Sequence, residues 1–323
     1  MARECQSSRM AEVGDGSGAK RPPTNDQAPT NDQPSEQIGD WIEIADGVHR
    51  LVAEPAGVTI GLVVGSRGAL LIDTGSSPQQ GAELRAAVAR VTDRPLLAVV
   101  VSHGHYDHAF GLSAYTDLPT IGHESLADDR SRAAVAEEAV RDGIDPAAAE
   151  LPRTLISIAD VVDLGGSRVA EIVHLGVGHT RGDLVVSVTD AGAENFPGVI
   201  FAGDLIETAA APWFGPESSP DQWSWTVDRL HGLGTETTVY VPGHGDPIGR
   251  DAVLEQRNAI DGVRMEIERL AGSGVAQGDA LAQGDWPIPG EHVADGIAAG
   301  YVEIAARAEH EPGAGGRPTL PLA

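Results

Sequence analysis

Three imidazoles and one carboxylate stand within six consecutive positions of this 323-residue chain, and side chains of these types are common metal ligands. They are His103, His105, Asp107 and His108, and they directly follow the apolar run at residues 96–101. Because alternate side chains at a strand end point to the same side, His103 and His105 can converge on one cation. Asp107 and His108 come a turn later and can face a second cation. The cluster therefore predicts a metal site at the end of a buried strand.

Three later polar residues have a similar setting, because each comes shortly after an apolar segment that is typical of a strand. His179 follows the predicted strand at residues 169–175, Asp204 follows the apolar segment 199–202, and His244 follows 237–241. A glycine precedes each of the three, and glycine lets the backbone turn sharply and approach a bound ion closely. We expect these side chains to meet the first cluster at one edge of the fold.

The composition restricts what this site can act on. The chain has 22 Lys and Arg against 48 Asp and Glu, so its formal net charge is -26, which repels nucleic acids and anionic membranes. We therefore expect a small-molecule substrate and neither a nucleic-acid nor a membrane partner. The single cysteine, Cys5, excludes an intrachain disulfide and lies far in sequence from the candidate ligands. The sequence shows neither a secretory signal nor a run of 18 apolar residues, which predicts a cytoplasmic protein.

The chain divides by composition into four parts. Residues 1–38 are polar, contain a tandem Pro-Thr-Asn-Asp-Gln repeat and are predicted to be a disordered tail, and residues 39–250 are predicted to form the domain that carries the candidate ligands. Within 39–250, two successive β-rich halves each carry helices, which favours two packed sheets covered by helices. Residues 251–310 read as a C-terminal helical extension, and residues 311–323 as a loose tail.

With these motifs in place, residues 48–247 resemble the metallo-β-lactamase superfamily of hydrolases. Its HxHxDH signature stands at residues 103–108, and the later histidine, aspartate and histidine follow in the family's order. The resemblance implies an α+β fold, an αββα four-layer sandwich followed here by C-terminal helices. It also implies two metal ions, usually zinc, although iron or manganese can replace it. One ion would be held by His103, His105 and His179, the other by Asp107, His108 and His244, with Asp204 bridging them.

The resemblance also implies a function, a dinuclear zinc-dependent hydrolase that uses a metal-bridging hydroxide to cleave an ester, thioester, lactone or related small-molecule bond. Asp107 is the expected catalytic residue, since it can orient the hydroxide and return a proton. Asp73 is expected either to orient a ligating imidazole or to cap the turn before Gly75. Trp213 is interpreted as an aromatic wall for the substrate.

Three alternatives stay open for the reaction. The chain is similar to glyoxalase II-type thioesterases, whose anionic substrate would need basic side chains such as Arg250, Arg257 or Arg264. A β-lactamase acting on antibiotics is the second alternative, although many of these use a cysteine ligand in place of an aspartate. A non-haem iron sulfur dioxygenase is the third, and it would need only one metal ion.

Overall fold

The computed structural model of the chain describes residues 36–310. Most of the predicted tail at 1–38 and all of the predicted tail at 311–323 lie outside this range. Gln37–Ile38, at the end of the first of these segments, form strand β1, which pairs antiparallel with β3. Two residues are too short a stretch to show strand periodicity, so the sheet begins inside the range predicted as tail.

The first sheet has eight strands in the order β1-β3-β4-β5-β6-β7-β8, with β2 paired to β3. After β1, these are β2 (Ile42–Ala45), β3 (Val48–Glu54), β4 (Val58–Val64), β5 (Ala69–Ile72), β6 (Leu96–Val100), β7 (Thr120–His123) and β8 (Thr154–Ile156). The strands up to β5 pair antiparallel, whereas β5, β6, β7 and β8 pair in parallel. The carboxyl ends of β5 and β6 therefore lie at the same edge of the sheet.

The second sheet has five strands in the order β13-β12-β11-β10-β9. They are β9 (Ala159–Gly165), β10 (Arg168–His174), β11 (Leu184–Asp190), β12 (Val199–Gly203) and β13 (Val239–Pro242). β9 to β12 pair antiparallel, and β12 and β13 pair in parallel. The ends of β12 and β13 thus deliver their following loops to one edge, as the ends of β5 and β6 do in the first sheet.

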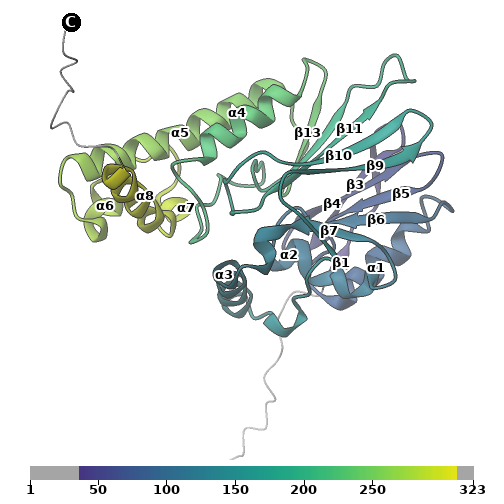
Figure 1. Cartoon of the computed structure of the whole chain (residues 1–323), viewed down its shortest axis with the longest axis horizontal. Helices are drawn as coiled ribbons and strands as arrows, with labels where there is room; N and C mark the ends of the chain where they lie inside the picture. The colour runs from purple at the N-terminus through teal and green to yellow at the C-terminus, as the bar shows by residue number, and fades with distance from the viewer. Residues whose placement is uncertain (1–35, 311–323) are drawn as a thin grey trace, which may run out of the picture. The chain divides into compact units, whose positions relative to one another are not determined.

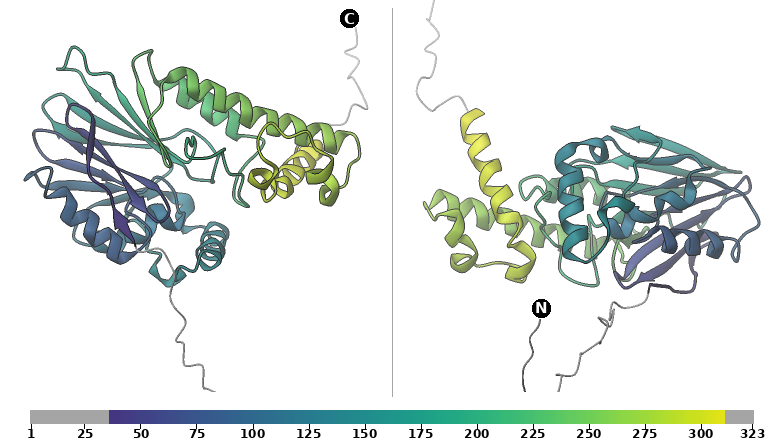
Figure 2. Two further views of the ribbon diagram at one scale, coloured as in Figure 1. Left: turned by 180° about the vertical axis from the view of Figure 1, so that it is seen from behind. Right: turned by 90° about the horizontal axis from the view of Figure 1, so that it is seen from below.

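Helices connect and cover the strands. They are α1 (Pro78–Val88), α2 (Tyr106–Ala109), α3 (Asp129–Arg141), α4 (Trp223–Leu233), α5 (Arg250–Gly272), α6 (Gln277–Gln283), α7 (Gly290–Val293) and α8 (Gly296–His310), with short 3-10 turns at Phe110–Tyr115, Glu124–Ala127 and Pro146–Ala148. The predicted helical extension corresponds to α5 to α8, and Figure 2 shows α6 to α8 gathered around the end of α5 that lies away from the sheets. None of the helices described between residues 36 and 310 combines the length and apolar character needed to cross a membrane.

Three buried clusters define four layers (Figure 1). The central cluster joins the facing sides of the two sheets, with Ile72 from β5 packed among residues such as Ile172 and Phe201 of the second sheet. Leu84 of α1 packs in a cluster on the outer side of the first sheet, and Val227 of α4 does so on the outer side of the second. Burial of apolar side chains between layers is the main driving force for such stacking. The predicted αββα sandwich with C-terminal helices is confirmed.

Candidate metal centre

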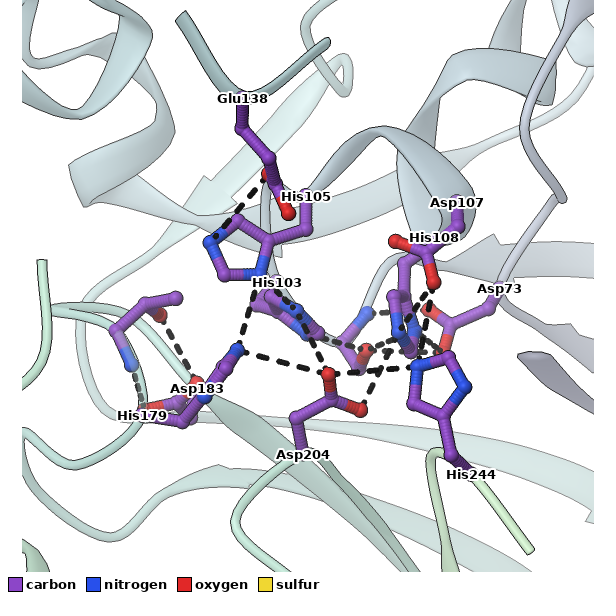
Figure 3. Close-up of polar contacts among 12 residues, drawn as sticks. Asp73, His103, His105, Asp107, His108, Glu138, His179, Asp183, Asp204 and His244 are labelled. Atoms are coloured by element: carbon purple, nitrogen blue, oxygen red, sulfur yellow. Dashed lines mark hydrogen bonds and ion pairs between the residues drawn. The ribbon is translucent and has the colours of Figure 1, made fainter. Parts of the chain in front are cut away.

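The seven predicted ligands meet at the edge where both sheets present their strand ends (Figure 3). The segment after β6 supplies four of them, and the loops after β10, β12 and β13 supply one each. They form two groups in which the ligand atoms lie within 4.8 Å of one another: His103, His105, His179 and Asp204 in the first group, and Asp107, His108 and His244 in the second. The structure therefore brings together every side chain that the sequence proposed as a ligand.

In the first group, three imidazole nitrogens converge on one region. Nδ1 of His105 lies 3.1 Å from Nε2 of His103 and 2.9 Å from Nε2 of His179. An oxygen of Asp204, Oδ2, lies 3.7 Å from the same nitrogen of His103 and 3.5 Å from that of His179. Three nitrogens and a carboxylate oxygen facing one region match the donor set that zinc prefers.

In the second group, Nε2 of His244 lies 3.2 Å from Oδ2 of Asp107, and Nε2 of His108 lies 3.7 Å from the same oxygen. Asp204 reaches this group too, because its Oδ1 lies 3.3 Å from Nε2 of His108 and its Oδ2 lies 3.6 Å from Nε2 of His244. Asp204 therefore lies between the two groups, where the family resemblance places a bridging carboxylate.

Burial and charge set the protonation of the two groups differently. Burial lowers the pKa of His103 well below its ordinary value, lowers that of His105 to about 3, and lowers that of His179. These imidazoles therefore keep free lone pairs at neutral pH. Burial also disfavours the charged form of His108 and His244, but nearby carboxylates outweigh it, Asp204 most strongly, and raise the pKa of His108 well above the ordinary value and that of His244 to about 11.

Two buried atoms test whether this arrangement fits cations. Nε2 of His108 and Oδ1 of Asp204 are buried, lie 3.3 Å apart and have no hydrogen-bond partner among the described residues. Leaving such groups unpaired costs about 1–3 kcal/mol each, so natural structures normally give them a partner. A cation between the groups would satisfy both atoms and would compensate the carboxylates of Asp107 and Asp204. The residues present therefore fit a pair of divalent metal ions.

Asp73 follows β5 and supports the second group from behind. Its Oδ2 lies 2.8 Å from Nδ1 of His108, and its Oδ1 accepts a hydrogen bond from the backbone N–H of Ser102 at 2.7 Å. Asp73 has a φ of 65°, a left-handed conformation that is uncommon outside glycine. Of the two roles that the sequence left open, the contact with His108 is the orienting one, because it leaves Nε2 facing the metal groups.

Three acidic residues near the site were not identified from the sequence. Glu138 on α3 lies 3.7 Å from Nε2 of His105, and burial raises the pKa of its carboxyl to about 9. Asp183 accepts hydrogen bonds from the backbone N–H and the hydroxyl of Thr180, and so shapes the loop that carries His179. Burial raises the pKa of Asp183 and of Glu207 to about 8. None stands in a ligand-rich motif, so only the fold reveals their positions.

The aromatic residue Trp213 lies beside the first group. Its ring centroid is 6.0 Å from that of His105 and 6.2 Å from that of His179. The guanidinium carbon of Arg141 lies 5.3 Å from the centroid of the same ring, a cation–π distance. The side chain of Arg141 is half exposed. Trp213 and Arg141 therefore give the surroundings of the first group an apolar face with a positive charge on it.

Comparison with known proteins agrees with this geometry. The model of the metallo-beta-lactamase superfamily matches residues 53–244, a segment that includes all seven ligand candidates. The chain belongs to the metallo-beta-lactamase superfamily. Membership confirms the family resemblance and the prediction of a metal-dependent hydrolase.

Individual relatives of this metallo-beta-lactamase superfamily member are distant. A metallo-beta-lactamase type 2 of Bacillus sp. (strain 170) is 24% identical over 208 residues, which are 64% of this chain and 72% of that protein. A linear primary-alkylsulfatase of Pseudomonas sp. (strain ATCC 19151) is 24% identical over 251 residues, which cover 66% of this chain but only 47% of that protein. The solved metallo-beta-lactamase from Pontibacter korlensis superposes with a TM-score of 0.53 at 20% identity, over 70% of this chain and 99% of that one. At this identity the structural likeness shows the fold alone.

Proposed function

We propose that the protein is a dinuclear zinc-dependent hydrolase that cleaves an ester, thioester, lactone or related bond of a small molecule. The observation that carries the proposal is the convergence of seven ligand side chains into two adjoining groups with Asp204 between them. Nitrogen and carboxylate ligands without a thiolate suit zinc, and iron or manganese fit the same donors.

In this proposal, His103, His105 and His179 hold one ion, Asp107, His108 and His244 hold the other, and Asp204 contacts both. Two bound zinc ions would lower the pKa of water toward neutrality and would polarise the carbonyl oxygen of the substrate.

The chain itself supplies positioning and proton transfer. Asp107 orients the attacking water through a carboxylate oxygen and returns the proton to the leaving group. Nε2 of His244 lies 3.2 Å from Oδ2 of Asp107, so both side chains would hold the same ion, and that shared ion would fix the position of the carboxylate. Trp213 packs against the apolar part of the substrate, and Arg141 on its ring attracts a substrate that carries a negative charge.

The alternative arginines proposed from the sequence have other partners. Arg250 pairs with Glu236, Arg257 with Asp228 and Arg264 with Asp261. Arg141 also has an acidic partner, since its Nε lies 3.6 Å from Oδ1 of Asp142. It is nevertheless the better candidate for contact with an anionic substrate, because it lies against an aromatic ring that adjoins the first group.

β-Lactam cleavage is the second candidate reaction, and the relatives named metallo-beta-lactamases favour it. Against it stands Asp204 at the bridging position, where many β-lactamases have a cysteine. We propose a small-molecule substrate and no nucleic-acid or membrane partner, in keeping with the net charge of -26, and a cytoplasmic location.

The test is a substrate panel with protein of measured metal content. Esters, thioesters, lactones, β-lactams, sulfate esters and phosphodiesters are compared for turnover with two zinc ions bound. We expect carbonyl substrates to be fastest, and His105→Ala or Asp204→Asn to abolish turnover while circular dichroism stays native. His231→Ala, on α4, is the control. Fastest turnover of phosphodiesters would contradict carbonyl chemistry, and one iron per chain would favour the dioxygenase.

A further inference from the structure

The two nitrogens of His105 face different surroundings. Nδ1 faces the first metal group, because it lies 3.1 Å from Nε2 of His103 and 2.9 Å from Nε2 of His179. Nε2 points the other way, toward α3, where a carboxylate oxygen of Glu138 lies 3.7 Å away (Figure 3). A neutral imidazole carries one proton, so His105 can present a lone pair at Nδ1 only when Nε2 holds that proton.

Glu138 lies where it can accept this proton. Its side chain is only 13% exposed, and its Oε2 atom is buried without a hydrogen-bond partner among the described residues. Val135 and Ala139 on the same side of α3 are buried, and they fix the helix against the domain. Either charge state of a carboxyl group retains an oxygen that can accept a hydrogen bond. Oε2 of Glu138 is thus a buried acceptor without a hydrogen-bond donor, 3.7 Å from the nitrogen of His105 that faces away from the first metal group.

The second metal group already contains such a pair. Oδ2 of Asp73 lies 2.8 Å from Nδ1 of His108, so the carboxylate backs the imidazole on the side away from the ligand atom. Carboxylates in this position fix the tautomer and orientation of ligating histidines. Glu138 stands to His105 as Asp73 stands to His108, although it comes from a helix and its contact is longer.

We propose that Glu138 is a positioning residue, which accepts the Nε2 proton of His105 and thereby keeps the Nδ1 lone pair directed at the first metal group. The proposal rests on the metal assignment of the proposed function. It adds α3 to the elements that define the centre, although this helix carries none of the seven ligands.

The experiment compares native protein with three variants. Glu138→Met keeps the length of the side chain but removes the acceptor, Glu138→Gln restores an acceptor oxygen, and Glu137→Met is the matched control at an exposed position of the same helix. Zinc affinity is measured by competition with a chromophoric chelator. We expect Glu138→Met to weaken one of two zinc equivalents by about 10- to 100-fold, Glu138→Gln to recover most of that loss, and Glu137→Met to change neither.

A second measurement needs no metal. Long-range ¹H–¹⁵N NMR of the metal-free protein reports which ring nitrogen of His105 carries the proton. We expect Nε2 in the native protein and in Glu137→Met, and a mixture of tautomers in Glu138→Met. The proposal is overturned if Glu138→Met binds both equivalents as tightly as Glu137→Met, or if native His105 carries its proton on Nδ1. Native protein that binds fewer than two zinc ions would contradict the proposed function. In that case only the measurement of the His105 tautomer would test the role of Glu138.

Discussion

A single methyl group at Gly243 should disable the metal centre, although Gly243 is not a ligand. A Cβ atom at this position would lie 1.8 Å from Oδ1 of Asp204 and 3.0 Å from the backbone carbonyl carbon of Gly203. Normal contact requires the carboxylate to retreat by about 1.5 Å, because nonbonded carbon contacts are favourable only near 3.5–4 Å. Metal–ligand distances tolerate only about 0.2 Å. Gly243→Ala therefore removes Asp204 from both metal groups.

The expected loss is larger than that caused by residues that only support a ligand, whose substitution costs about 10- to 100-fold in affinity. We predict at least a 100-fold loss of zinc affinity, which is about 2.7 kcal/mol. The assay is chelator competition, with thermal unfolding of the metal-free protein to verify the fold. Gly249→Ala is the control, because a Cβ there meets nothing within 4 Å. Native zinc affinity in Gly243→Ala would refute the assignment of Asp204 as a ligand.

Three further predictions concern Asp73, Trp213 and Glu217. Asp73→Asn should place an amide donor or a weaker acceptor against Nδ1 of His108, lowering zinc affinity by at least about tenfold and unfolding free energy by about 1–3 kcal/mol, as measured by chelator competition and urea unfolding. Trp213→Ala should raise KM about three- to tenfold at unchanged zinc content, and a fall in kcat alone would contradict its role as a substrate wall. Burial raises the pKa of Glu217 from 4.5 to about 7, so the folded protein holds this proton more tightly, and ionisation costs stability as pH rises through that interval. Glu217→Gln should therefore stabilise the zinc-loaded protein by up to about 3 kcal/mol at pH 8 but little at pH 4.5, and an equal effect at both pH values in urea unfolding would contradict this.

The ligands were predictable from the sequence because histidine is scarce and glycine marks sharp turns at strand ends. His103 to His108 follow an apolar run that is long enough to identify as a buried strand, and the structure has β6 there. The two β-rich halves with their helices predicted two packed sheets covered by helices, and the family resemblance predicted the same four layers. Strand periodicity does not state which strands face each other, so the strand order could not be predicted.

Other features could not be predicted, because their sequence patterns are weak or because they depend on contacts between residues far apart in the sequence. β7 (Thr120–His123) is only four residues long, which is too short to show strand periodicity. In β9 (Ala159–Gly165), Asp160 is half-buried whereas Val161 is exposed, so apolar and polar residues do not alternate between the two faces as in a typical strand. Glu138 stands in a helix rich in charged residues, where nothing distinguishes it from Glu137. Its contact with His105 depends on how α3 docks, which is a long-range property.

The origin of the ligands in two different sheets has a consequence for the motions of the fold. Four ligands follow β6 of the first sheet, whereas His179, Asp204 and His244 follow strands of the second. A bound ion would link the ligand-bearing edges of the two sheets, which are otherwise held together by the apolar cluster between them. Loading should therefore slow amide hydrogen exchange in both sheets at once, and chelation should let that edge open while the opposite edge stays closed.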